Sequence, residues 1–455
     1  MSENRIARSK VHLIGVGGIG MSAIAEILVT LGAEVSGSDI RKSERTEYLE
    51  KKNVRICIGH SAENIKDADV LVYSSAISID NPEMLFAKAK NIPTISRAEA
   101  LAELMRAKRG VAIAGTHGKT TTTSMVAQIF ESASRQPTVV SGGIVHRFGS
   151  NAKLGAGEWF IAEADESDGS FEKLSPELSV ITNIDNDHIE HYGSYKNLLE
   201  CFLKFADRIP FYGSVVYCGD DEDCKKIFES FQKKSISYGF GEHNEFSLRD
   251  FGKGLFQVSH KDDVLGEFKA PLPGNHNALN ALAAMVVGLR AGIDFETVKE
   301  GIESFSGVRR RFEIKADHEE RDLIVVDDYA HHPTEVVATL TACKKRFLGC
   351  RIRCVFQPHR YSRLKTCWDQ FKNAFDMADE LYLTDVYPAG EEVLKGYESR
   401  DLLTNVTNSK VFMASGDFEK VSADLLESSR PGDVIITLGA GDVYKISDLV
   451  AGKLD

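Results

Sequence analysis

Residues 115–120, Gly-Thr-His-Gly-Lys-Thr, have the types and spacing of a phosphate-binding loop. They follow the apolar run 111–114 and precede a helical pattern, so the expected order is strand, glycine turn and helix. Such a turn directs backbone N–H groups and the positive end of a helix at one point. Lys119 adds a cation for the β- and γ-phosphates, and the Thr120 hydroxyl is a ligand for Mg²⁺. The loop therefore predicts ATP as a ligand.

This loop lacks one glycine of the usual pattern. Ile113 stands five positions before Gly118, where that pattern has glycine, so the turn is shorter and depends on Gly115. The simpler interpretation, a structural glycine turn followed by a chance Lys-Thr, explains fewer of these residues.

A second glycine turn, Gly-Val-Gly-Gly-Ile-Gly at residues 15–20, follows the apolar run 11–14. Asp39 ends the next predicted strand, nineteen residues after Gly20. Residues 73–77 lie at another strand end and are expected to line the same crevice. Because this geometry binds any pyrophosphate, it predicts a diphosphate-bearing ligand. It leaves NAD, or a purely structural turn, as alternatives.

Two further strand ends in the middle of the chain present acids. One carries Glu163, Asp165, Glu166 and Asp168, and the other, residues 183–188, ends in His188. Carboxyl ends of parallel strands meet at one edge of a sheet, so we expect these groups to face Lys119. Four carboxylates cannot all bind Mg²⁺, and the others would cap a helix or be solvated. His188 is equally consistent with a metal ligand and a core histidine.

Two more clusters lie farther along the chain. Asn277 and Asn280 are one turn apart in a predicted helix, where they would contact a base or ribose, or cap and pack the helix. Arg360 and Arg363 are three residues apart on a turn that enters a helix, which suits a bidentate clamp on a carboxylate or phosphate. With the arginines at 309–311 they form a cationic pocket or, alternatively, a solvated basic face.

Short Val/Ile/Leu-rich runs alternate with helical patterns along the whole chain, which predicts parallel α/β layers. A chain of 455 residues is too long for one ordinary core and predicts about three domains. We separate three blocks that begin near residues 10, 110 and 323.

The composition excludes several classes of partner. The net charge of −12 disfavours nucleic acid or an anionic membrane as the main partner. No apolar run approaches the roughly 20 residues of a membrane span, so we expect no membrane insertion. The eight cysteines are scattered, which is typical of reduced thiols in a cytoplasmic protein.

Together these motifs resemble the Mur ligases of peptidoglycan synthesis. The matching passages run in family order along nearly the whole chain: residues 15–22, 73–77, 97–99, 115–123, 163–171, 182–192, 273–281, 307–312, 327–335, 357–363 and 387–391. The resemblance implies an α/β protein of three domains. These are an N-terminal Rossmann-like domain for a UDP moiety (1–107), a central ATPase domain of P-loop type (108–312) and a C-terminal Rossmann-like domain for an amino acid (313–455).

The implied activity is an ATP-dependent ligation of L-alanine to the lactyl carboxylate of UDP-N-acetylmuramate. The carboxylate would attack the γ-phosphate to give an acyl phosphate and ADP, and the amine would then displace phosphate. ATP and two Mg²⁺ ions are the implied cofactors, and the implied partners are these two small-molecule substrates. The protein would be a monomer or a weak homodimer.

The resemblance also implies a role for each site residue. The ATP-binding residues would be Gly115, Thr116, His117, Gly118, Lys119, Thr120, Thr121, Asn277, Asn280 and Arg310. The UDP-substrate-binding residues would be Gly17, Gly18, Ile19, Gly20, Met21, Ser22, Asp39 and Ser75. The L-alanine-binding residues would be Tyr329, His331, Arg360 and Arg363. The metal ligands would be Thr120, Glu163 and His188, and the catalytic residues Lys119, Glu163, His188 and Asp328.

Two alternatives to this activity are retained. A ligase that attaches a murein tripeptide to the same nucleotide shares the central motifs, although its first glycine turn differs. A nicotinamide-dependent oxidoreductase is supported only by the turn at residues 15–20.

Overall fold

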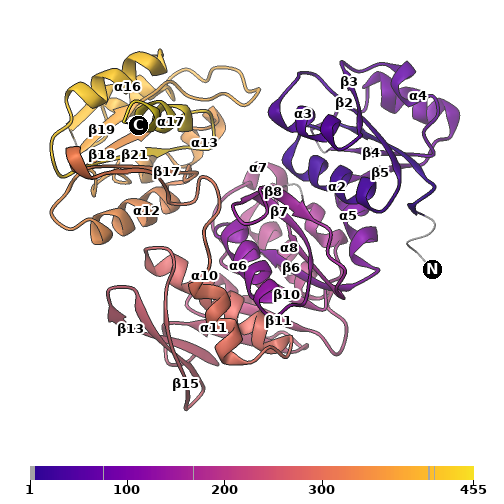
Figure 1. The fold of residues 1–455 in the computed structure, drawn as a ribbon, viewed down its shortest axis with the longest axis horizontal. Coiled ribbons are helices and arrows are strands. Elements are labelled where there is room, and N and C mark those ends of the chain that lie inside the picture. The colour runs from indigo at the N-terminus through magenta and orange to yellow at the C-terminus, as the bar shows by residue number, and fades with distance from the viewer. Residues whose placement is uncertain (1–5, 75, 168, 408–409, 415, 455) are drawn as a thin grey trace. The chain divides into compact units, whose positions relative to one another are not determined.

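The computed structural model describes residues 6–74, 76–167, 169–407, 410–414 and 416–454. Ser75 and Asp168, both named above, lie outside these residues. The described chain forms three sheets with helices between their strands, which confirms the predicted α/β class (Figure 1). It divides into two compact units, one of Met1–Pro271 with Leu279–Ser306 and one of Leu272–Ala278 with Gly307–Asp455.

The first sheet is parallel throughout and has the strand order β3-β2-β1-β4-β5. Its strands are β1 (Lys10–Ile14), β2 (Glu34–Asp39), β3 (Arg55–Ile58), β4 (Val70–Tyr73) and β5 (Thr94–Ser96). The helices between and after them are α2 (Ile19–Thr30), α3 (Glu44–Lys51), α4 (Pro82–Lys90) and α5 (Arg97–Met105). The strand order reverses at β1, so the ligand crevice is expected at the carboxyl ends of β1, β2 and β4.

The second sheet has the order β15-β14-β13-β12-β11-β10-β6-β9-β7-β8. Its central parallel strands are β6 (Arg109–Ala114), β9 (Trp159–Glu163), β10 (Leu178–Ile181), β11 (Ser214–Cys218) and β12 (Ser235–Gly239), and β7 and β13 continue the parallel pairing on either side. Its other strands are β7 (Thr138–Val145), β8 (Ser150–Lys153), β13 (Phe246–Gly252), β14 (Leu255–His260) and β15 (Asp263–Lys269). Strand β6 lies between β9 and β10, so the three strand ends predicted to carry chemistry are neighbours.

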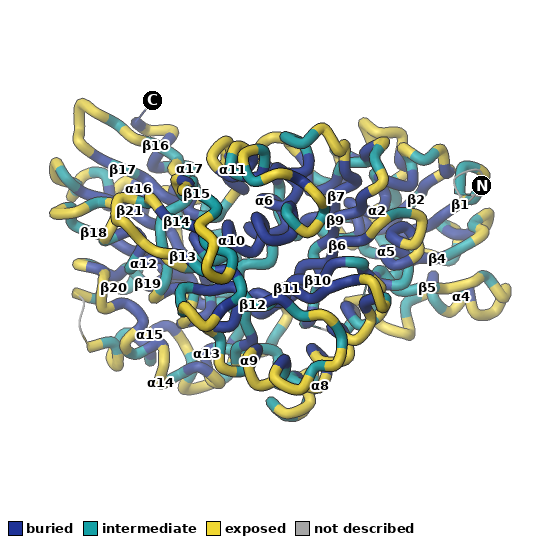
Figure 2. Tube along the Cα trace, turned by 90° about the horizontal axis from the view of Figure 1, so that it is seen from below, coloured by how far each residue is buried: buried dark blue, intermediate teal, exposed yellow. Residues whose placement is uncertain are grey.

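The helices around the second sheet are α6 (Lys119–Ser132), α7 (Ile189–Tyr192), α8 (Tyr195–Ala206), α9 (Glu222–Glu229), α10 (Asn275–Arg290) and α11 (Phe295–Glu303). Helix α6 packs on β6, β7 and β9 and is covered by α11. Strands β6 and β10 are almost wholly buried, which gives the sites at their ends a rigid base (Figure 2).

The third sheet has the order β16-β17-β21-β18-β19-β20, and only its edge strand β16 is antiparallel to its neighbour. Its strands are β16 (Glu313–His318), β17 (Leu323–Asp328), β18 (Arg351–Phe356), β19 (Glu380–Leu383), β20 (Lys410–Met413) and β21 (Asp433–Leu438). Its helices are α12 (Pro333–Arg346), α13 (Tyr361–Thr366), α14 (Trp368–Phe371), α15 (Ser399–Leu403), α16 (Phe418–Glu427) and α17 (Tyr444–Gly452). In the described part of the chain, every helix is too short or too polar to span a bilayer.

A buried carboxylate, Glu83 near the start of α4, contacts the first sheet. Its oxygens accept hydrogen bonds from Ser38 Oγ at 2.6 Å and Asn64 Nδ2 at 2.6 Å, and His12 Nε2 lies 3.6 Å away. Burial raises the pKa of Glu83, but the contacts with His12, Ser38 and Asn64 outweigh it and lower the pKa to about 2. The ionised form of Glu83 therefore stabilises the folded sheet.

We expect Glu83→Gln to destabilise the first sheet at neutral pH by a few kcal/mol, because the ionised carboxylate is the form that its neighbours bind. The folded pKa lies below the ordinary value, so this contribution is complete above about pH 4.5 and disappears as the pH falls toward 2. Hydrogen exchange of the β1 amides measures the effect, with the exposed Glu103→Gln as control. Equal protection of variant and wild type at pH 7 would contradict the prediction.

Candidate active site

The phosphate-binding loop joins β6 to α6 and is held in place by the residues that follow β10. Thr182 Oγ1 donates to the carbonyl of His117 at 2.6 Å. The side chain of Asn183 accepts from the N–H of His117 at 2.8 Å and donates to its carbonyl at 3.0 Å. Sequence reasoning gave Thr182 and Asn183 no role, although their position at a neighbouring strand end was the available signal. These contacts fix the loop's conformation before any ligand arrives.

Two glycines of the loop are required by its shape. Gly115 has φ +127°, and a Cβ there would lie 2.0 Å from Thr182 Oγ1. Gly118 has φ +84°, and its Cβ would lie 2.5 Å from Asn280 Oδ1. The structure therefore brings Asn280, on α10, against the loop. Asn277 is on the same helix but within the segment Leu272–Ala278, which belongs to the other compact unit.

Gly118→Ala is expected to weaken ATP binding at least tenfold. The added Cβ strains a left-handed backbone by ~1 kcal/mol and also displaces the Asn280 amide. Calorimetric titration with a non-hydrolysable ATP analogue measures the loss. Gly292→Ala is the matched control, because Gly292 has φ +78° but nothing within 4 Å of its Cβ position. Equal losses in the two variants would contradict a specific role of Gly118 in ATP binding.

Lys119 lies inside the loop and is 15% exposed. Its Nζ donates to the carbonyls of Gly115 at 2.7 Å and Thr116 at 3.0 Å and to Glu166 Oε1 at 2.7 Å. Burial lowers the pKa of Lys119, but the carboxylates of Glu166 and Glu163 outweigh it and raise the pKa. The amine is therefore charged at neutral pH, as binding to phosphate requires.

The acids at the end of β9 surround this lysine, which confirms that the two strand ends face each other. Glu163 accepts the N–H of Gly142 at 2.7 Å, so its carboxylate is fixed by backbone. Asp165 pairs with Arg97 at 2.9 Å. Burial raises the pKa of Glu166 to about 7, and its Oε2 is buried without a hydrogen-bond partner among the described residues. This carboxylate-rich, incompletely satisfied set of oxygen ligands after β9 fits a hard divalent cation such as Mg²⁺, and the assignment of Thr120 as a further ligand is retained as a prediction.

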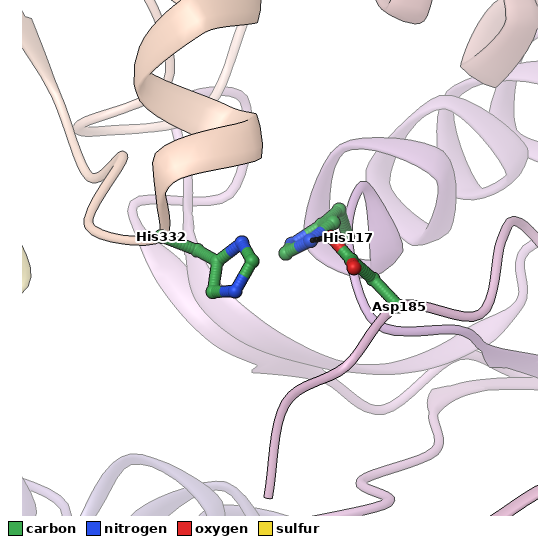
Figure 3. Close-up of side chains that lie close together, drawn as sticks. All are labelled: His117, Asp185 and His332. Atoms are coloured by element: carbon green, nitrogen blue, oxygen red, sulfur yellow. Dashed lines mark hydrogen bonds and ion pairs between the residues drawn. The ribbon is translucent and has the colours of Figure 1, made fainter. Parts of the chain in front are cut away.

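The end of β10 carries two more ionisable pairs. His117 Nε2 lies 2.9 Å from Asp185 Oδ2, as the close-up in Figure 3 shows for these two side chains. His188 is the N-cap of α7 and has a left-handed backbone, φ 61°, and its Nε2 lies 3.6 Å from Asp187 Oδ2. A histidine with a left-handed backbone in the loop after a strand is typical of a functional position, and the assignment of His188 as a metal ligand is retained as a prediction.

The first glycine turn is held by Asp39, whose carboxylate accepts a hydrogen bond from the N–H of Gly17 at 2.9 Å. Helix α2 begins at Ile19, so its first N–H groups have no acceptor within the helix and are suited to bind an anion. Met21 and Ser22 are buried, and the Ser22 hydroxyl donates to the carbonyl of Ile19 at 2.9 Å. Gly17 and Gly18 therefore lie in the turn itself, whereas Met21 and Ser22 belong to the helix behind it.

In the second compact unit, Asp328 is a buried connector. Its carboxylate accepts the N–H groups of Phe312 at 2.7 Å and Ala330 at 2.8 Å. Burial raises its pKa to about 6, against the attraction of Arg311. Asp328 thereby connects Phe312, which precedes β16 of the third sheet, to Ala330 in the loop after β17.

Arg310 is engaged within the same unit. Its guanidinium pairs with Asp327 at 3.2 Å, donates to the carbonyls of Gly439 and Gly441, and lies 4.7 Å from the ring centroid of Tyr444. These contacts stabilise the turn after β21. The assignment of Arg310 to ATP phosphates is therefore a prediction that would require it to leave or share them.

The predicted amino-acid residues gather at the carboxyl ends of β17 and β18. The rings of Tyr329 and His331 are 5.3 Å apart, and that of His359 is 5.8 Å from His331. Arg363 Nη1 lies 3.3 Å from His359 Nδ1, and His359 stacks on Tyr387 at 5.5 Å. Arg360 is the N-cap residue of α13, with φ 68°. His359 and Tyr387 stood in passages already noted in the sequence, but they had been given no role.

Both histidines of this cluster are neutral. Burial, joined by the charge of Arg363, lowers the pKa of His331 to about 3 and that of His359 to about 4. Cationic arginines beside uncharged imidazoles suit a ligand that carries both a carboxylate and an amine.

Known proteins and protein families match this chain over nearly its whole length. Profiles described as Mur ligase family, catalytic domain, as Mur ligase middle domain and as Mur ligase, glutamate ligase domain match residues 10–109, 113–288 and 310–441. The chain is 47% identical over 457 residues to a UDP-N-acetylmuramate–L-alanine ligase of Bdellovibrio bacteriovorus, covering 99% of this chain and 100% of that protein. A protein of the same name from a Geobacter species is 47% identical over 451 residues, covering 98% and 97%.

Solved structures show the same fold. The crystal structure of UDP-N-acetylmuramate–alanine ligase from Thermotoga maritima is 30% identical, with a TM-score of 0.83 and coverage of 98% of this chain and 99% of that one. A murein peptide ligase from Psychrobacter arcticus matches with a TM-score of 0.74 at 22% identity, over 98% and 99% of the two chains, which supports the fold alone.

Proposed function

Since this chain belongs to the Mur ligase family of ATP-dependent ligases, we propose that it joins L-alanine to the lactyl carboxylate of UDP-N-acetylmuramate. The observation that carries this proposal is the 47% identity, over nearly the full length, to a protein named for that reaction. The arginine and histidine cluster around Arg363 supports an amino-acid acceptor. We also propose that the protein acts in the cytoplasm, in the synthesis of peptidoglycan precursors.

The proposed mechanism has two steps. The lactyl carboxylate attacks the γ-phosphorus of ATP, and ADP leaves, which turns a poor acyl donor into an acyl phosphate. The neutral amine of alanine then attacks the acyl carbon, phosphate leaves, and the amine loses a proton. Lys119 neutralises charge as two anions approach, while the loop N–H groups hold the phosphates. Arg360 and Arg363 bind the alanine carboxylate and orient the amine.

We assign Mg²⁺ to the oxygen ligands Thr120 and Glu163 and propose a second ion at His188. When bound, Mg²⁺ would neutralise the phosphate oxygens. Gly17, Gly18, Ile19, Gly20 and Asp39 would hold the UDP diphosphate and ribose. The domains would span residues 1–107, 108–312 and 313–455.

A phosphate-release assay with a panel of acceptors tests the function. Purified protein with ATP and Mg²⁺ should release phosphate only when UDP-N-acetylmuramate and L-alanine are both present. Release without either substrate, or none with both, would refute the proposal. Faster turnover with a murein tripeptide than with L-alanine would instead support the recycling ligase, and tight binding of NADH would support the oxidoreductase.

A further inference from the structure

Arg97 stands where a cation is locally unfavourable. It is the first residue of α5, after the N-cap Ser96, and the N-terminal end of a helix carries positive partial charge. Its side chain is only 23% exposed. A largely buried arginine at this position indicates that something other than helix stability determines the residue.

The guanidinium of Arg97 lies on the backbone of Gly20. A Cβ on Gly20 would come within 2.6 Å of Nη1 and 3.0 Å of Cδ of Arg97. Gly20 is the second residue of α2, inside the turn proposed to bind a diphosphate. The arginine therefore occupies the space beside N–H groups that themselves attract an anion.

The other edge of the same guanidinium reaches the ATP loop's acidic strand end. Arg97 Nη2 donates to Asp165 Oδ2 at 2.9 Å, and Asp165 Oδ1 accepts the N–H of Ser167 at 3.0 Å. Lys119 is close enough to Asp165 that its charge, after that of Arg97, opposes the effect of burial and helps to lower the pKa of Asp165 to about 2. The guanidinium of Arg97 thus lies beside Gly20 of the first glycine turn and also pairs with Asp165, which lies near the phosphate-binding loop.

Helix α2 is also fastened to the second sheet directly. Asn151 Nδ2 donates to the carbonyl of Ile19 at 2.6 Å, and Ser150 Oγ donates to Glu26 at 2.8 Å. Because the start of α2 is anchored to β8, the contact of Arg97 with Gly20 and Asp165 belongs to a built interface within one compact unit.

We propose that Arg97 binds the diphosphate of the nucleotide sugar at Gly20. Through its contact with Asp165, Arg97 would also hold the nucleotide sugar at a fixed position relative to the Lys119 loop. A guanidinium has five donors in a plane, so it can keep Asp165 on one edge and bind a phosphate oxygen with the other. The inference rests on the proposed function, because it assumes that the first turn receives a nucleoside diphosphate.

Binding is measured first, by calorimetric titration of the full-length protein with UDP-N-acetylmuramate in the absence of ATP. Arg97→Ala should raise the Kd roughly 10- to 100-fold, and Arg97→Lys, which retains charge without the fork, should fall between it and wild type. The control is Arg106→Ala, which removes an exposed arginine from the end of the same helix.

Kinetics then separates binding from positioning. Arg97→Ala should raise the KM for UDP-N-acetylmuramate while leaving that for L-alanine within about twofold. Arg97→Ala and Asp165→Asn should each lower kcat tenfold or more, and Asp165→Asn should do so with little change in the Kd of the nucleotide sugar. The double variant should have a kcat close to that of the worse single variant, because both changes break one connection.

The outcomes distinguish a failure of the inference about Arg97 from a failure of the proposed function. If the wild-type protein does not bind UDP-N-acetylmuramate, the proposed function fails. If the wild type binds it and folded Arg97→Ala and Arg97→Lys proteins bind it equally well, the role of Arg97 is wrong. Additive losses of kcat in the double variant would overturn the connection through Asp165.

Discussion

Replacing Lys119 by alanine should reduce ATP-dependent ligation by about three orders of magnitude or more. Lys119 is the cation held inside the phosphate-binding loop, and its charge is sustained by Glu166 and Glu163 against burial. Its removal leaves the lactyl carboxylate and the γ-phosphate to approach each other as anions, and also leaves Glu166 buried without its cation. The loss should therefore fall mainly on kcat.

Single-turnover formation of ADP measures this loss at the first chemical step. The control is Lys196→Ala, since Lys196 is an exposed lysine whose side chain is 83% accessible. Lys119→Arg should recover little activity, because the longer planar group does not fit the space between the Gly115 and Thr116 carbonyls. If folded Lys119→Ala protein kept more than a tenth of the wild-type rate, the assignment of Lys119 to phosphate would be wrong.

The parts of the site that could be predicted from the sequence are those with a local signal. Residues 111–120 combine an apolar run, glycines and a helical pattern, and the structure has β6, the turn and α6 in that order. The acids after β9 faced Lys119 as expected, because neighbouring parallel strands end at one edge. Local periodicity and the rules of parallel sheets together were sufficient for these features.

The contacts that could not be predicted join residues far apart in the sequence. Asn183 holds the loop from 66 positions away, and Arg97 reaches Asp165 across 68. The family resemblance implied that Arg310 binds the ATP phosphates, which stays a prediction, but the sequence held no signal for its contacts with Asp327 and with two carbonyls after β21. Sequence chemistry shows what a side chain can bind, whereas the fold determines which partner is within reach.

Arg363→Ala should raise the KM for L-alanine by about 100-fold or more. Its guanidinium lies at the carboxyl end of β18 beside His359, where it can bind a carboxylate in the bidentate manner that a lysine cannot copy. ATP and UDP-N-acetylmuramate should keep KM values within about threefold of wild type. Arg346→Ala, at an exposed arginine in the last turn of α12, is the control.

The same substitution has a second, independent readout. Burial is the main cause of the low pKa values of His331 and His359, about 3 and 4, and the charge of Arg363 adds to it. Removing Arg363 should therefore raise both pKa values while leaving them below the ordinary 6.5, which titration of the imidazole resonances by NMR measures. Both imidazoles are uncharged above pH 6 in the wild-type protein, so the amine of alanine, and not these histidines, should govern the rise of its activity between pH 6 and 9. An unchanged KM for L-alanine with raised histidine pKa values would separate the electrostatic role of Arg363 from acceptor binding and refute the latter.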